Sequence, residues 1–145
     1  MISETEIAWL AGLLEGEGYF SLRKARKIKS TGEERWDPTI VLVMSDLDIV
    51  ERCARMWGTH ASELKKREEH HLPSYRCTLR GSGAIHWMKR IYPYMGARRR
   101  EKIKEIIEQW ETMPLYKKPI LRRNRPEGFL KDLAVFDPAL IAGEF

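Results

Sequence analysis

The spacing of apolar residues predicts that the chain begins with a helix and passes directly into a strand. Four early apolar residues recur at intervals of three and four, which is helical spacing: Ile7, Leu10, Ala11 and Leu14. Ser3 and Glu6 form a capping-box sequence ahead of them, so we expect a helix from about residue 4 to residue 16. The interval then becomes two, with Phe20 and Leu22 on one side of a strand whose other side is polar and basic.

The alternation of helix and strand continues to about residue 110. Gly58 is expected to end the second helix, and Pro93 to break the third. After the first helix the expected elements are, in chain order, a strand at 19–27, a loop at 30–35, a strand at 38–44, a helix at 45–57 capped by Ser45 or Asp46, strand segments at 60–69 and 72–80, and helices at 82–92 and 97–110.

This order predicts the fold class α+β, with a four-stranded antiparallel sheet. Helices would cover the apolar face of the sheet and leave the opposite face open. After Trp110 the pattern weakens and the chain becomes rich in proline and charge. We therefore assign residues 1–110 to one core domain and residues 111–145 to a partly irregular extension with a short helix at 128–136.

The composition narrows the class of protein. A length of 145 residues suits one domain with a substantial core. With 43% hydrophobic and 32% charged residues the chain reads as soluble, and no apolar run approaches the roughly 20 residues that cross a membrane. The N-terminus lacks the basic region of a secretory signal. We expect an intracellular protein without a membrane segment.

The cysteines and histidines show no metal-binding pattern. Cys53 and Cys77 lie in apolar segments without paired spacing, so both are expected to be reduced core residues. The histidines share no zinc-ligand spacing with them, which favours packing or surface roles for His60, His70, His71 and His86.

The charge points to an anionic partner mainly through its distribution. The net charge is +5. Basic residues gather in four runs, at 23–29, 65–67, 98–100 and 117–125. Any one run can be a solvated surface, but four runs, two of them on predicted strands, favour a polyanion. Because a two-stranded ribbon can enter the DNA major groove, a basic open sheet predicts a nucleic-acid saddle.

Two glycines in the first helix require an explanation, because glycine in a helix interior costs about 1 kcal/mol relative to alanine. Gly12 and Gly16 lie four residues apart, hence on one face, where they would allow a partner helix to approach closely. Glu17 follows at the negative end of the helix dipole, where a carboxylate favours a nearby cation. Two such helix ends brought together would place two carboxylates at one point, which divalent cations would stabilise. The alternative is a simple turn with a solvated Glu17.

The stretch "LAGLLEGEG", residues 10–18, resembles the LAGLIDADG motif of homing endonucleases. Five positions are identical, and acids stand at both acidic positions of the motif, as Glu15 and Glu17. The order of elements over residues 4–110 is similar to the αββαββα core and saddle-shaped sheet of that family. The segments "SDLDIVERCARMWG" and "YPYMGARRREKI" are similar to its second-helix and last-helix segments.

The resemblance implies a sequence-specific, double-stranded DNA homing endonuclease from a mobile genetic element, as in intron homing. A single motif implies a homodimer and a long pseudo-palindromic target, cleaved to leave short 3′ overhangs. The cofactor implied is Mg²⁺, for which Mn²⁺ can substitute. The motif helix would form the dimer interface through Leu10, Gly12, Leu13 and Gly16.

The resemblance also assigns the catalytic residues. Glu17 would bind the metal together with the carbonyl of Gly16. Arg98 matches the basic residue near the metal, and Asp46 the polar residue that positions water. Two alternatives remain open, a phosphate clamp formed by Arg98 with its neighbours and an N-cap role for Asp46.

The open face of the sheet is expected to read the DNA. The predicted contacts are Ser21, Arg23, Lys27, Arg35, Thr39, Lys65, Arg67, Ser74, Arg76, Thr78, Arg80, Arg99 and Arg100, with Tyr19, Ala25, Trp36 and Glu63 on the same surface or its loops. Val41 and Val43 are unusual on a wet face. Either they meet thymine methyl groups, or the alternation in this strand is shifted by one residue.

Two other function classes remain. A non-cleaving relative could act as an RNA-splicing maturase or as a DNA-binding regulator, in which case RNA becomes a partner. A plain basic binding module without dimerisation is the third class, and it conflicts with the paired glycines.

Overall fold

The computed structural model describes residues 1–24, 36–66 and 68–113 of the chain. In chain order the elements are α1 (Glu4–Glu17), β1 (Gly18–Lys24), β2 (Trp36–Met44), α2 (Leu47–Trp57), β3 (Ser62–Leu64), β4 (Ser74–Arg80), α3 (Ser82–Ile91), the 3-10 turn η1 (Tyr92–Tyr94) and α4 (Ala97–Thr112). The predicted order of helices and hairpins is confirmed. The extension beyond Met113, including the predicted helix at 128–136, lies outside the described residues.

Helix α1 begins and ends as its sequence dictates. The Ser3 hydroxyl accepts a hydrogen bond from the Glu6 amide at 3.2 Å, and the Glu6 carboxylate accepts one from the Ser3 amide at 2.9 Å. These bonds also lower the pKa of Glu6. At the other end a Cβ on Gly18 would lie 2.6 Å from the carbonyl oxygen of Leu14. Gly18 therefore lets the chain pass from helix to strand without a loop.

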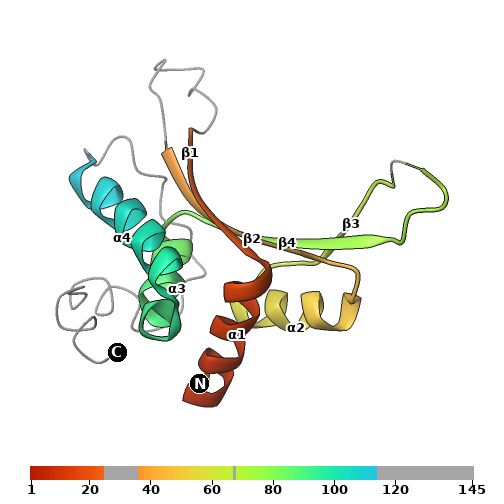
Figure 1. Cartoon of the computed structure of the whole chain (residues 1–145), viewed down its shortest axis with the longest axis horizontal. Coiled ribbons are helices and arrows are strands. Elements are labelled where there is room, and N and C mark those ends of the chain that lie inside the picture. Colours follow the sequence, from red (N-terminus) through yellow and green to blue (C-terminus); the bar gives the residue numbers. More distant parts are fainter. Residues whose placement is uncertain (25–35, 67, 114–145) are drawn as a thin grey trace.

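The sheet has the order β1-β2-β4-β3, with all neighbours antiparallel. Figure 1 shows the helices on one side of this sheet. The side chains that point toward them form the buried core together with the helices, and those from the strands include Phe20, Ile40, Leu42 and Cys77. Val43 is 38% exposed while Leu42 is fully buried, so the predicted alternation in β2 is correct and the valines do lie on the open face.

The prediction for the third strand is wrong in its alternation. Strand β3 is only three residues long, and Ser62 pairs with Arg76 and Leu64 with Ser74. Directly paired residues share a face, so Ser62 and Leu64 lie on the open side while Glu63 does not. Lys65 follows the end of the strand and is exposed.

The remaining core follows the predicted apolar positions. Helix α4 buries Ile103, Ile106, Ile107 and Trp110. Cys53 of α2 and Cys77 of β4 are free, buried thiols, as predicted, and their mutual hydrogen bond together with burial raises the pKa of Cys53. Within the described ranges, every helix is too short or too polar to traverse a lipid bilayer.

Candidate functional site

The C-terminal end of α1 carries an exposed carboxylate. Glu17 is the last residue of the helix, and among the described residues it has no hydrogen-bond or ion-pair partner. The last turn contains no basic residue to offset the negative end of the helix dipole. Carbonyl groups in the last turn of a helix lack hydrogen-bond partners within the helix. The carbonyl oxygen of Gly16 is therefore a second possible metal ligand at the same place. Carboxylate and carbonyl oxygens are the ligands that Mg²⁺ prefers, so these residues fit that cation.

One face of α1 is exposed to solvent and consists of small residues. Gly12 and Gly16 are exposed, and a Cβ built on either would meet no atom within 4 Å. Ala8 is also exposed one helical turn earlier, so Ala8, Gly12 and Gly16 form a strip of small residues, which we call the small-residue strip. Half-buried Trp9 and Leu13 form a ridge beside it. A strip and a ridge on one helix can pack against the same features on a second copy.

Leu10 does not belong to this face. The sequence resemblance assigns it to the dimer interface, but the structure buries it completely in the core of the same chain. Ala8 takes its place on the exposed side. It escaped the prediction because it lies outside the nine-residue motif, although its spacing of four from Gly12 was a usable signal.

The first acid of the motif, Glu15, makes contacts that Glu17 does not make. The Glu15 carboxylate accepts a hydrogen bond from the amide of Gly96, at 3.2 Å, just before α4 begins. The Arg99 guanidinium donates to the carbonyl oxygen of Glu15 at 3.3 Å and lies 5.7 Å from the centre of the Phe20 ring. The first turn of α4 is therefore docked on the last turn of α1.

The three arginines of α4 are not equivalent. The sequence predicts Arg99 and Arg100 as DNA contacts, but Arg99 is half-buried and engaged with α1. The Arg100 guanidinium is half-buried as well and lies 5.9 Å from the Tyr92 ring. Arg98 is exposed, and the neighbouring contacts of Gly96 and Arg99 hold its turn against the end of α1. The turn of α4 that contains Arg98 therefore lies against the last turn of α1.

Asp46 lies at the N-cap position of α2, and its carbonyl oxygen accepts from the amides of Ile49 and Val50 at 3.2 Å. Its side chain forms no capping bond and is exposed, so the carboxylate is available for another role. Because Gly18 pairs with Leu42, the end of β2 that precedes Asp46 lies at the same end of the hairpin as Glu17.

The open face of the sheet carries exposed arginines and a middle row of apolar and polar residues. Arg23, Arg76 and Arg80 are exposed. The middle row consists of Tyr19, Val41 and Thr78, which pair directly across β1, β2 and β4, with Tyr19 54% exposed. Ser74 and Thr78 are half-buried on this side. The predicted contacts Lys27, Arg35 and Arg67 lie outside the described residues.

Two predicted DNA contacts are poorly accessible. Ser21 and Thr39 pair with each other, and only 8% and 2% of their surfaces are exposed. The Thr39 hydroxyl donates to the carbonyl oxygen of Asp37 at 3.2 Å. Their face was predicted correctly, but neither hydroxyl is presented on the surface, so direct base contacts from them are not supported.

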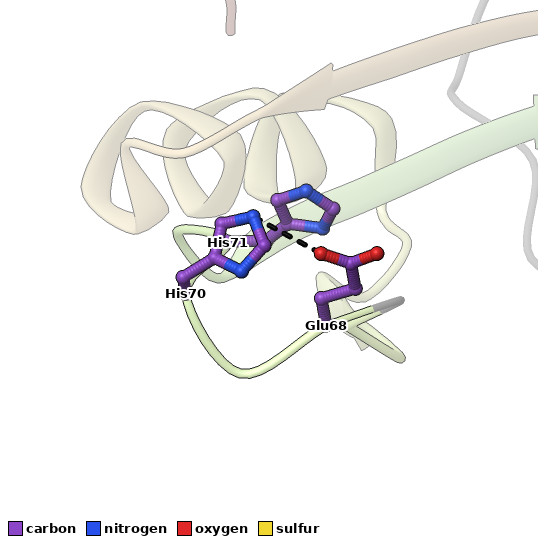
Figure 2. A group of neighbouring side chains, drawn as sticks. All are labelled: Glu68, His70 and His71. Carbon is purple, nitrogen blue, oxygen red and sulfur yellow. Dashed lines mark ion pairs between the residues drawn. The ribbon is translucent and has the colours of Figure 1, made fainter.

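A separate group of possible metal ligands lies in the loop between β3 and β4. Figure 2 shows Glu68 next to His70 and His71, with Glu68 and His70 3.1 Å apart as an ion pair. All three side chains are exposed. Imidazole nitrogen suits zinc or nickel better than Mg²⁺, so this group is not a substitute for the oxygen donors of Glu17 and Gly16.

Comparison with known proteins establishes the fold. No family model and no curated protein matches the sequence. Among solved structures the chain is similar to the homing endonuclease I-CvuI in complex with the I-CreI target in 2 mM Mg, with the DNA not cleaved, at 13% identity and a TM-score of 0.60, covering 98% of this chain and 83% of that one.

Two further structures agree. I-CvuI in complex with its own target in 2 mM Ca gives 13% identity and a TM-score of 0.60 over 97% of this chain and 82% of that one. The homing endonuclease I-TnaI gives 16% identity and a TM-score of 0.51 over 74% and 71%. The chain therefore has the LAGLIDADG homing endonuclease fold, which confirms the predicted fold class and, for the fold, the resemblance carried by the motif.

Proposed function

We propose that this protein is a homodimeric, divalent-metal-dependent endonuclease that cleaves a long, pseudo-palindromic double-stranded DNA site. The observation that carries the proposal is the end of α1, where Glu17 is exposed and unpaired among the described residues, next to the small-residue strip. The fold supports it, because structures with the same fold include homing endonucleases solved on DNA.

Dimerisation would complete the site. One chain supplies one Glu17, and packing two small-residue strips against each other brings a second Glu17 to the same place. Two close carboxylates repel each other strongly, and divalent cations between or beside them offset that repulsion. The two sheets would then form one basic saddle with two-fold symmetry, which matches a pseudo-palindromic target.

In the proposed mechanism Glu17 and the carbonyl of Gly16 would hold Mg²⁺, and Mn²⁺ could replace it. The chemistry that such a bound cation supplies is activation of water and stabilisation of charge on the scissile phosphate. Arg98 would neutralise the phosphate, and the free carboxylate of Asp46 would accept a hydrogen bond that orients the attacking water. Arg23, Arg76 and Arg80 would contact guanine edges or phosphates. The enzyme would act inside the cell, in the compartment that holds its DNA target.

Selection from a randomised double-stranded DNA library, followed by incubation with Mg²⁺ or Ca²⁺, tests the proposal. We expect cleavage of the selected DNA with Mg²⁺ but not with Ca²⁺, and none from Glu17→Gln, which removes the charge and keeps the shape. Glu105→Gln, on the exposed side of α4, is the matched control and should cleave normally.

Three outcomes would contradict the proposal. Binding without cleavage would favour a regulator, failure to select any DNA would favour a splicing maturase with RNA as its partner, and undiminished cleavage by Glu17→Gln would remove Glu17 from the active site. Sedimentation with and without DNA tests the dimer, since a chain that stays monomeric in both conditions would indicate a plain binding module.

A further inference from the structure

The C-terminal end of α1 and the N-terminal end of α4 lie against each other, and each carries side chains whose charge has the same sign as that end of its own helix dipole. Helix α1 ends with Glu15 and Glu17 and has no basic residue in its last turn. Helix α4 begins at Ala97, has no acidic residue in its first turn, and continues with Arg98, Arg99 and Arg100. Acids at a C-terminal end and bases at an N-terminal end are both unfavourable for an isolated helix. Each end therefore needs the opposite charge from elsewhere.

The two ends satisfy part of this need by contacting each other. The residue at the N-cap of α4 is Gly96, which has no side chain to cap the helix. Glu15 supplies the missing carboxylate from α1 and accepts the Gly96 amide at 3.2 Å, while Arg99 donates to the Glu15 carbonyl at 3.3 Å. A capping box places an acid of the same helix in this role, and here another helix provides it.

The absence of a side chain on Gly96 leaves room for the carboxylate of Glu15. A Cβ on Gly96 would lie 2.8 Å from Glu15 Oε1 and 3.6 Å from its Cδ. An alanine at this position would therefore push the carboxylate out of place while leaving Glu15 itself present. A separate surface contact lies at the opposite end of α1, where the Tyr94 hydroxyl donates to Glu4.

We propose that Glu15 is a positioning residue, whose carboxylate fixes the first turn of α4 on α1 and thereby sets Arg98 beside the metal-binding end of the helix. The inference rests on the proposed function. It divides the two acids of the motif between two tasks, with Glu17 left free for the cation and Glu15 committed to holding the arginine-bearing turn. Glu15 acts through Arg98 and is not a metal ligand.

The test compares variants by single-turnover cleavage over a range of Mg²⁺ concentrations. Glu15→Ala removes the acceptor, and we expect the rate at saturating Mg²⁺ to fall between about tenfold and a hundredfold, the cost of a displaced reacting group. The half-saturating Mg²⁺ concentration and the affinity for DNA should not change. Glu15→Gln keeps an acceptor oxygen and should restore most of the rate, whereas Gly96→Ala should lower it as Glu15→Ala does.

Tyr94→Phe is the matched control. It removes the surface hydrogen bond at the opposite end of α1 without touching the turn of Arg98, so its cleavage rate should equal that of the wild type. If Glu15→Ala instead raises the Mg²⁺ requirement, Glu15 is a metal ligand and the inference fails. If its rate is unchanged, or falls no further than that of Tyr94→Phe, the positioning role is refuted.

A readout that does not depend on cleavage separates this inference from the proposed function. In the wild type the Gly96 amide should exchange slowly with solvent deuterium, and in Glu15→Ala it should exchange at least about tenfold faster, because its only acceptor among the described residues is gone. Equal exchange in both proteins would overturn the docking of α4 by Glu15. If exchange differs between the wild type and Glu15→Ala but the wild type cleaves no DNA, the docking of α4 by Glu15 stands. The proposed function is then overturned, and the role of Glu15 in positioning Arg98 for cleavage is overturned with it.

Discussion

A leucine at position 12 should separate the stability of the single chain from the stability of the dimer. In the chain itself Gly12 is exposed and a Cβ would meet no atom within 4 Å, so Gly12→Leu introduces no clash. Replacing an interior helical glycine by leucine gains about 0.8 kcal/mol in helix propensity. At concentrations where both proteins are monomeric, the free energy of unfolding should therefore rise by about that amount.

The dimer should respond in the opposite direction. The proposed dimer would carry the substitution twice at the contact between the two small-residue strips, and overpacking costs about 1–3 kcal/mol per site. A total of about 2–6 kcal/mol raises the Kd of the dimer between about thirtyfold and more than ten-thousandfold. Because a single chain supplies only one of the two Glu17 carboxylates of the proposed active site, cleavage should be lost.

Sedimentation equilibrium and urea unfolding, measured over a range of protein concentrations, give both quantities. Glu105→Leu is the control, since it adds the same side chain at an exposed position of α4. A Gly12→Leu protein that dimerises as tightly as the wild type would show that the small-residue strip is not the interface. A loss of monomer stability would show that the strip already packs within the chain.

Three more substitutions test individual contacts. Gly18→Ala should lower the free energy of unfolding by more than about 1 kcal/mol, because its Cβ would lie 2.6 Å from the Leu14 carbonyl oxygen, and an unchanged urea midpoint would refute this. Burial lowers the pKa of Lys89 below its ordinary value, so the unfolded chain binds more protons there and the free energy of unfolding should rise with pH between the folded-state and the unfolded-state pKa. Lys89→Met should remove this rise in urea unfolding at alkaline pH, and an equal rise in both proteins would contradict it. If Val43 contacts a thymine methyl, replacing that thymine by uracil should weaken DNA binding about fourfold, as expected for about 0.8 kcal/mol, while Val43→Ala should show little difference between the two bases.

Most of the fold could be predicted because its signals are local. The capping box at Ser3, the alternation of β1 and β2, and the proline break after α3 each act over a few residues, and the structure confirms all three. The third strand was mispredicted because its pattern is short. With only three paired residues, its register is set by β4 and not by its own alternation of polar and apolar positions.

The site was harder to predict because its contacts link distant parts of the chain. A sequence pattern indicates that Leu10 is apolar and close to Gly12 and Gly16, but it cannot tell the buried side of a helix from the exposed side where the two adjoin. The structure separates them, with Leu10 buried and Ala8 exposed. Likewise three consecutive arginines look equivalent in sequence, and only packing against Glu15 and Phe20 distinguishes Arg99 from Arg98.

The charges at the end of α1 connect metal binding to dimerisation in the proposed enzyme. Glu15 is compensated within the chain by the first turn of α4, but Glu17 has no such partner among the described residues. Association of two chains without a cation would bring two uncompensated carboxylates together at the negative ends of two helix dipoles. In the proposed dimer a cation held by both carboxylates would favour association, and association would favour cation binding by the same free energy. The small-residue strip would then bring two chains close enough for catalysis, while the strength of their association would depend on the metal.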